Sequence, residues 1–242
     1  MPSFNRQPDR GARLFEEIIH SPSLVALWPM NEKSGTIFDR GPNRLDGTVS
    51  GNPTYSKAIG PTYGLDLDGT GDYVTVAAAG VASALDFERT SSFSMLAILD
   101  PNISAIGSII GKRNDGGDEE GWSWQLSATG VPIVTLQATA ANRVVVTSNA
   151  ALANGVDVML GFSYAGTSAA TGVVLYKNGA VDADTDTATP IDASILSTSF
   201  GVSIGRIDAA FDFNGDIGFV AVWNKVVSAE DMRRYAFLAG FL

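Results

Sequence analysis

The chain has 242 residues, no cysteine and one histidine, and its 16 Lys and Arg against 26 Asp and Glu give a formal net charge of −10. The lack of cysteine excludes disulfides, thiolate zinc sites and cysteine nucleophiles, and a single imidazole excludes a multi-histidine metal site. The acidic balance disfavours nucleic acid as a partner. No run of 18 apolar residues is present, so membrane insertion is not expected.

The composition favours a compact, turn-rich β protein. Hydrophobic residues make up 45% of the chain and charged residues 17%, with 26 Gly and 10 Pro. That profile is unlike the composition of disordered or coiled-coil chains. A length of this order is compatible with one large all-β domain, and neither a linker nor a repeat of fixed period interrupts the sequence.

The first predicted element is a short amphipathic helix over residues 13–20, where Leu14, Phe15, Ile18 and Ile19 fall on one side. Period-two alternation and frequent turn residues then predict about thirteen short strands. In chain order these strands are 24–28, 45–50, 64–67, 73–76, 93–99, 108–112, 122–126, 131–138, 143–148, 158–164, 173–177, 201–206 and 217–223.

Turn and cap signals complete the pattern. Asn178-Gly179 predicts a two-residue hairpin, because both turn positions favour positive φ. The polar stretch 181–193 is interpreted as a long loop. Ser228 with Asp231 three residues later is a weak capping box, and it predicts a short C-terminal helix that ends at Gly240.

The ordered set of segments resembles the laminin-G-like, concanavalin A-like lectin/glucanase domains, and the resemblance covers about residues 23–238. The segments that carry it are 24–35 (LVALWPMNEKSG), 65–74 (LDLDGTGDYV), 175–179 (LYKNG) and 213–224 (FNGDIGFVAVWN). The resemblance implies an all-β jelly roll, a sandwich of two antiparallel sheets, over residues 23–242. Residues 1–22 lie outside the pattern and are interpreted as a separate N-terminal segment.

The resemblance also implies rim loops that in many relatives bind glycans, proteins or calcium. By position in the family pattern, Asp39 and Asp216 are the predicted calcium ligands. The alternative is that these acids, like others beside glycines at strand ends, accept hydrogen bonds from the backbone of turns. Gly218 stands where many relatives carry an acidic residue, a departure that weakens the metal prediction.

Some relatives are glycoside hydrolases, which need two carboxylates about 5–9 Å apart across the scissile bond. Asp182, Asp184 and Asp186 have the alternating spacing of such a strand, but the small polar residues between them favour a solvated loop. The acidic run 118–120 lies in a glycine-rich turn. The chain is therefore predicted not to be an enzyme, with glycoside hydrolysis as the weaker alternative.

Sugar rings stack on exposed aromatic side chains, so the aromatic residues decide the candidate ligand site. Most of them alternate along strands and are predicted to be core residues. Trp122 follows the acidic turn 114–121 and is predicted to lie at the rim, together with the polar side chains of Asn114 and Asp115. Tyr55 and Tyr63, on either side of Pro61 in a predicted long loop, are the other candidates.

The apolar stripe of Leu14, Phe15, Ile18 and Ile19 has two interpretations, which are packing onto the sandwich and an assembly contact with another subunit. We expect a non-catalytic, lectin-like binding or adhesion module whose partner is a carbohydrate or protein surface. The resemblance implies a fold that mostly acts outside cells, so the expected location is extracellular. No export signal is visible at the N-terminus, and a protein on the surface of a phage or virus particle needs none, so that surface is the other expected location. The alternative is a structural decoration protein, a homo-oligomer or capsid or tail component without glycan affinity.

Overall fold

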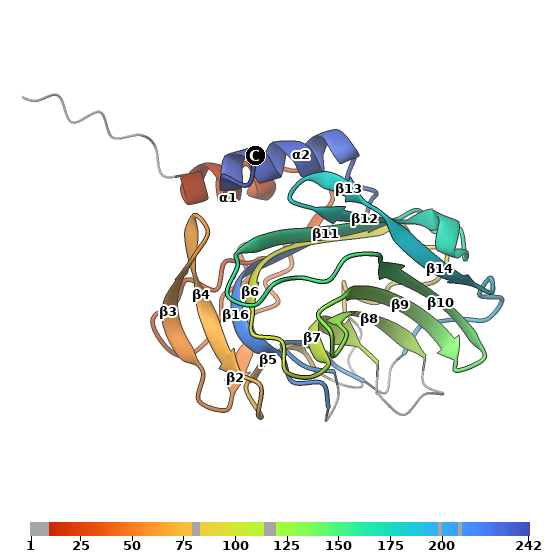
Figure 1. The fold of residues 1–242 in the computed structure, drawn as a ribbon, viewed down its shortest axis with the longest axis horizontal. Coiled ribbons are helices and arrows are strands. Elements are labelled where there is room, and N and C mark those ends of the chain that lie inside the picture. The colour runs from red at the N-terminus through yellow and green to blue at the C-terminus, as the bar shows by residue number, and fades with distance from the viewer. Residues whose placement is uncertain (1–9, 79–82, 114–119, 198–199, 208–209) are drawn as a thin grey trace, which may run out of the picture.

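A computed structural model describes residues 10–78, 83–113, 120–197, 200–207 and 210–242. The chain forms two eight-stranded antiparallel sheets packed face to face, with two helices on the outer face of one sheet (Figure 1). This architecture confirms the predicted jelly-roll sandwich with one helix near each end of the chain. Among the described residues no helix is long and apolar enough to cross a membrane.

The first sheet has the strand order β13-β12-β11-β6-β16-β4-β3, with β1 paired to β16. Its strands are β1 (Leu24–Trp28), β3 (Thr54–Ile59), β4 (Thr62–Asp68), β6 (Phe93–Pro101), β11 (Val158–Tyr164), β12 (Val173–Lys177), β13 (Ala180–Asp182) and β16 (Asn214–Trp223).

The second sheet has the order β14-β10-β9-β8-β7-β15-β5-β2. Its strands are β2 (Thr48–Ser50), β5 (Tyr73–Ala77), β7 (Gly107–Lys112), β8 (Gly121–Leu126), β9 (Pro132–Thr139), β10 (Asn142–Ser148), β14 (Asp184–Ala188) and β15 (Val202–Ile204). A short 3-10 helix, η1 (Ala170–Gly172), precedes β12.

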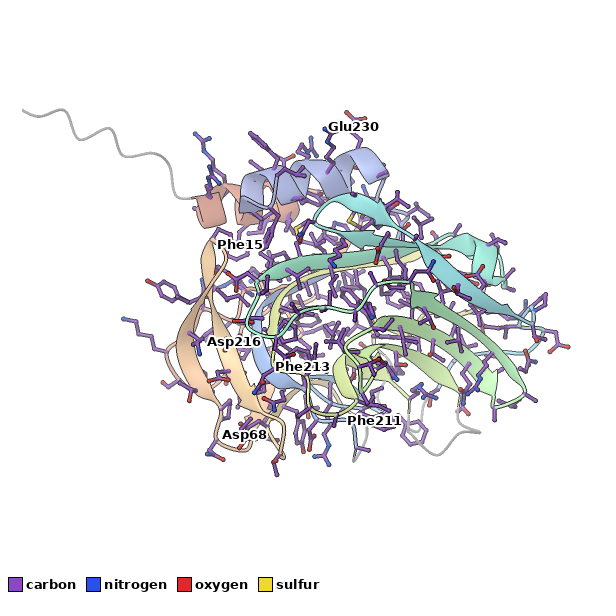
Figure 2. All side chains as sticks on the ribbon, viewed as in Figure 1. Phe15, Asp68, Phe211, Phe213, Asp216 and Glu230 are labelled. Carbon is purple, nitrogen blue, oxygen red and sulfur yellow. The ribbon has the colours of Figure 1, made fainter. Side chains whose placement is uncertain are left out.

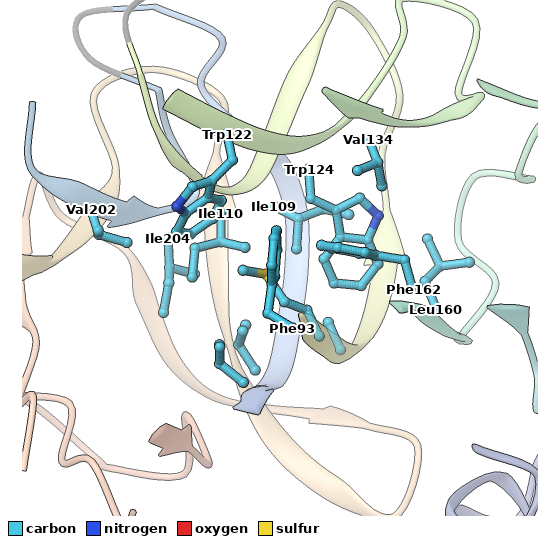
Figure 3. Packing of buried hydrophobic residues seen from close by; sticks show 14 of the residues in the cluster. Phe93, Ile109, Ile110, Trp122, Trp124, Val134, Leu160, Phe162, Val202 and Ile204 are labelled. Atoms are coloured by element: carbon cyan, nitrogen blue, oxygen red, sulfur yellow. The ribbon is translucent and has the colours of Figure 1, made fainter. Parts of the chain in front are cut away.

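The main core lies between the sheets, where the inward residues of the alternating strands meet. Trp122 and Trp124 of β8 point from one sheet toward Phe93 and Phe162 of the other (Figure 3). The Trp124 and Phe162 rings meet edge to face with centroids 5.3 Å apart, and Phe93 meets Phe162 in the same way at 5.6 Å. Large aromatic rings thus account for much of the apolar surface buried between the layers.

A second apolar cluster lies on the outer face of the first sheet, beneath α1 (Arg10–Ile19) and α2 (Ala229–Ala239). Leu14 and Ile18 of α1 are fully buried, and the Phe15 ring meets Phe219 of β16 edge-on at 5.7 Å. The assembly interpretation is wrong for these side chains, because the chain's own sheet occupies them. Ile19 remains 39% exposed.

Helix α2 has the caps that its sequence predicts. The Ser228 hydroxyl oxygen accepts a hydrogen bond from the Asp231 N–H, and Gly240 ends the helix at φ +85°. The Tyr235 ring stacks on Trp223 with centroids 5.8 Å apart, which fixes the helix on β16. A boundary between an N-terminal segment 1–22 and a domain 23–242 remains a prediction.

Two predicted loops are strands instead. The segment 181–193 contains the end of β13 and the whole of β14, which pairs with β10 as the edge strand of the second sheet. The predicted long loop around Pro61 is the β3–β4 hairpin at the other end of the first sheet (Figure 1). Both β14 and β3 are edge strands rich in polar residues, so they lack the apolar alternation of a strand with one fully buried face.

Candidate functional site

The candidate site is a surface formed by the β3–β4 hairpin and the loop that follows β1, and we call it the hairpin surface. Tyr63 of β4 and Tyr55 of β3, two of the ligand residues predicted from the sequence, are part of it, and they lie on strands and not in a loop. Tyr55 is paired with Leu65, and Tyr63 lies two residues before Leu65 on the same side of β4. The complete set is Glu32, Gly35, Phe38, Arg40, Tyr55 and Tyr63.

The two tyrosines differ in exposure. The Tyr63 side chain is 55% exposed, whereas Tyr55 is half-buried against the main core. The Tyr55 hydroxyl donates a hydrogen bond of 2.8 Å to the Gly35 carbonyl, which ties β3 to the loop. Burial raises the pKa of Tyr55, the bond to Gly35 lowers it, and the nearby Glu32 carboxylate adds to the rise. Tyr63 therefore offers a free ring face, and Tyr55 holds the loop in place.

The loop contributes a second exposed aromatic ring. Phe38 is 45% exposed, and the Arg40 guanidinium lies 5.8 Å from the centre of its ring. The Phe38 N–H donates to Glu32 Oε1 at 3.1 Å, and an Arg40 nitrogen lies 3.9 Å from the same oxygen. Glu32, which the sequence suggested was a solvated turn residue, has a side chain only 8% exposed. Glu32 positions Phe38 and Arg40. The sequence feature that could have indicated this role is its place before a glycine-containing turn.

The other predicted ligand residues do not join this surface. Trp122 is 2% exposed and packs in the main core, and its indole N–H donates to the Leu85 carbonyl at 3.2 Å. The prediction of a rim platform at Trp122 is therefore wrong, because Trp122 lies on the same face of β8 as Trp124 and Leu126, and that face is turned to the main core. Asn114 and Asp115 lie outside the described residues.

Asp39 is a buried acceptor for the backbone. Its Oδ1 accepts hydrogen bonds from the N–H groups of Leu27 and Gly41, and its Oδ2 accepts one from Leu45. The residue is 1% exposed. Three backbone donors of 2.7–2.8 Å occupy the carboxylate, so the structure favours the turn-stabilising alternative over a metal ligand.

Asp216, labelled in Figure 2, lies in a different cluster. Strand pairing places it in a row of acids across the outer face of the first sheet. Asp66 of β4 and Asp100 of β6 are its direct cross-strand neighbours, and the Lys57 ammonium lies 3.7 Å from Asp216 Oδ2. Asp216 is 4% exposed, and burial, followed by the Asp66 charge, raises its pKa to about 6 despite the opposing effect of Lys57. Burial and Asp157 also raise the pKa of Asp100.

No group of three or more His, Cys, Asp or Glu side chains among the described residues has an arrangement that could hold a metal ion. Asp216 has a lysine as its counter-ion and Asp39 has backbone donors, so the two predicted ligands belong to separate clusters. Calcium binding stays a prediction for this chain.

The acids of the segment after β12 do not form a catalytic strand. Asp182 ends β13 and accepts a hydrogen bond of 2.7 Å from the Ser148 hydroxyl, whereas Asp184 and Asp186 belong to β14. Burial raises the pKa of Asp184, and the charges of Asp186 and then Asp182 add to the rise. Asp184 and Asp186 alternate along β14, whereas Asp182 ends β13 in the other sheet, so the three acids do not lie on one strand.

Comparison with solved structures gives matches at low identity over most of the chain. Domain 4 of AbnA, a GH43 extracellular arabinanase from Geobacillus stearothermophilus solved with arabinotriose, has a TM-score of 0.65 and 14% identity, over 88% of this chain and 98% of that domain. The binding domain of botulinum neurotoxin DC with SialylT has a TM-score of 0.64 and 14% identity, over 91% of this chain and 52% of that one.

A third match is the CBM40 of the Ruminococcus gnavus IT-sialidase, bound to α2,3-sialyllactose. Its TM-score is 0.50 and its identity 17%, over 61% of this chain and 83% of that one. At such identities these likenesses concern the fold. A comparison with curated proteins gives no significant match. A sequence profile described as the concanavalin A-like lectin/glucanases superfamily, of the Laminin_G_3 type, matches residues 68–233, more than half of the chain. The chain therefore belongs to the concanavalin A-like lectin/glucanases superfamily.

Proposed function

We propose that the protein is a non-catalytic glycan-binding module and that the hairpin surface is its binding site. The observation that carries the proposal is the pair of exposed rings, Tyr63 and Phe38, on two segments that a hydrogen bond from Tyr55 joins. Such rings offer apolar faces to the C–H groups of a sugar, and the half-exposed Arg40 guanidinium offers donors to its hydroxyl oxygens. Because Glu32 and Tyr55 fix the loop, little ordering of the site is needed on binding.

The relatives in fold support this assignment. Three of them, from different organisms, were solved with arabinotriose, α2,3-sialyllactose or SialylT, so this sandwich has served for glycan recognition in unrelated contexts. A fold alone does not carry a function, and the exposed aromatic surface supplies the site that the inference needs.

The acidic row supports the non-catalytic part of the proposal. A glycosidase places two carboxyl groups on either side of a bond that must reach them. Asp216 is 4% exposed and has the Lys57 ammonium beside it, so a sugar cannot reach its carboxyl group without displacing the lysine. The raised pKa of Asp216 follows from burial and the neighbouring acids, which is also how structural acid clusters behave.

A module of this kind acts where glycans are displayed, so we place it outside the cell or on the surface of a phage or virus particle, as an accessory structural protein there. The alternative is a decoration or assembly protein without glycan affinity. A glycan array separates the two, because the alternative predicts that no glycan binds even at high protein concentration.

The site itself is tested by titration calorimetry with a glycan found on the array, using soluble, monovalent oligosaccharide. We expect Tyr63→Ala to weaken binding by about tenfold or more, since loss of one stacking ring removes on the order of 1.4 kcal/mol. Phe237→Ala is the matched control, because Phe237 is another highly exposed ring, on α2.

Equal affinity of the Tyr63→Ala variant and the wild type would refute the hairpin surface as the site. Release of reducing sugar from any bound glycan would refute the non-catalytic assignment. A blank array would favour the assembly protein over the proposed function.

A further inference from the structure

Helix α2 carries a stripe of exposed side chains on its outer side. Glu230, Arg233 and Phe237 follow one another at spacings of three and four residues and so share one side of the helix. All three are exposed, Phe237 by 66%, and Glu230 points away from the sheets (Figure 2). The ion pairs of α2 among the described residues are those of Arg234 with Glu17 and Asp231. The charges of the stripe are therefore available to a partner.

A groove of about 470 Å³ runs beside this stripe. Small residues of the β12–β13 turn and of the first turn of α2 form part of its lining, which comprises Gly179, Ala180, Ala229, Glu230, Arg233 and Leu242. Val181 on the adjacent edge strand is 63% exposed and Leu242 is 58% exposed. Three of the most exposed large apolar side chains thus lie around one face of α2, which is typical of a contact surface.

We propose that this face is the contact between two copies of the chain, related by a two-fold axis, with their α2 helices antiparallel. In that arrangement Glu230 of each copy meets Arg233 of the other, which forms the same ion pair twice. Phe237 lies four residues after Arg233 on the same side of the helix. The register that pairs the charges therefore also brings each Phe237 to the first turn of α2 in the second copy, which begins at Ala229.

The order of the side chains is what identifies the occupant. A two-fold contact requires that a surface be complementary to itself, with residue i against j and j against i. The order of acid and then base along α2, Glu230 followed by Arg233, is complementary to its own reverse. A parallel arrangement would set Glu230 against Glu230 and Arg233 against Arg233, and like charges in contact oppose association.

The dimer differs from the assembly that the sequence suggested, because Leu14 and Ile18 of α1 are buried in their own chain. The contact would use only the outer side of α2 and the β12–β13 turn, so the hairpin surface remains free in both copies. The two hairpin surfaces of one dimer would strengthen attachment to a multivalent glycan without any new contact to the sugar.

Sedimentation equilibrium of the full chain, up to hundreds of micromolar, tests the proposal through charge exchange. We expect a wild-type dimer. Glu230→Arg and Arg233→Glu should each raise the dissociation constant of the dimer by about tenfold or more, because two ion pairs become two like-charge contacts. The double variant should recover the wild-type constant. An equimolar mixture of the two single variants should form a heterodimer, since each then carries the complement of the other.

Two further variants control the experiment. Phe237→Ser removes the apolar contact and should also dissociate the dimer, whereas Lys33→Glu changes an exposed charge on a distant loop and should leave it intact. Thermal melting of each variant checks that the fold is kept. A wild type that is monomeric throughout the concentration range overturns the proposal. A dimer that survives Phe237→Ser or the single charge reversals overturns it as well.

Discussion

Asp216 makes the stability of the protein depend on pH in an unusual direction. Its pKa rises from 3.8 to about 6 in the folded chain, so between these two values the folded state binds a proton that the unfolded state has released. The free energy of unfolding therefore falls as pH rises through this window, and the contribution of Asp216 is constant above it. The stabilising form is the neutral carboxyl, which is fully present below the unfolded pKa.

The variant Asp216→Asn keeps the shape of this neutral form at every pH. A shift of roughly two units corresponds to about 3 kcal/mol, the largest gain that the variant could show above pH 6. That figure already includes the attraction of the Lys57 ammonium at 3.7 Å. Because an amide copies a protonated carboxyl group imperfectly, we expect a net gain of about 1–2 kcal/mol near pH 8. Near pH 4 the variant and the wild type should differ by much less.

Urea denaturation at a series of pH values between about 4 and 8 measures the difference. Burial also raises the pKa of the neighbouring Asp100, which adds its own pH dependence, so the test is the wild-type-to-variant difference at each pH. Asp192→Asn, which neutralises an exposed carboxylate elsewhere on the surface, is the matched control and should not reproduce the difference seen with Asp216→Asn. A difference independent of pH, or a variant less stable than the wild type near pH 8, would refute the reasoning.

Three further predictions concern the packing of α1, the backbone hydrogen bonds accepted by Asp39, and calcium binding. Leu14→Ala should lower the free energy of unfolding by about 2–5 kcal/mol in urea, because it opens a cavity in the fully buried cluster under α1. Asp39→Asn should lower the free energy of unfolding by about 3 kcal/mol in the same assay. The NH2 group of the asparagine would face the Leu45 N–H, which in the wild type donates to a carboxylate oxygen. Calcium binding requires a higher melting temperature with calcium than with a chelator in calorimetry, and an unchanged temperature would dismiss it.

The sequence predicted the strands of the two central layers well, because their apolar residues alternate. In β11 and β16, alternate side chains lie in the main core, and apolar side chains on the other face pack under the helices. The helix over residues 13–20 was predicted because its apolar residues recur at helical spacing, and it extends over Arg10–Ile19. Where both faces of an edge strand are largely polar, as in β14, periodicity gave no signal, and only pairing with β10 makes it a strand.

The candidate site was predicted only in part. Tyr63 and Tyr55 could be selected as aromatic residues beside a Gly-Pro turn, but a pattern along the chain does not show which ring stays exposed. The prediction for Trp122 failed for that reason, since its ring shares the inward face of β8 with Trp124 and Leu126. Phe38 and Arg40 could not be assigned to the site from sequence, because the Tyr55–Gly35 hydrogen bond that brings their loop to the hairpin joins residues 20 positions apart.

The acidic row and the helices have a common physical origin on the outer face of the first sheet. Along β6 the outward residues are Leu96 and Ile98, which pack beneath the helices, and then Asp100. Along β16 the aromatic residue Phe219 lies beneath α1, and Asp216 comes before it, past a register shift. The outward residues change from apolar to acidic within one strand. The raised pKa of Asp216 is the electrostatic consequence of burying one of these acids and of placing others beside it on adjacent strands.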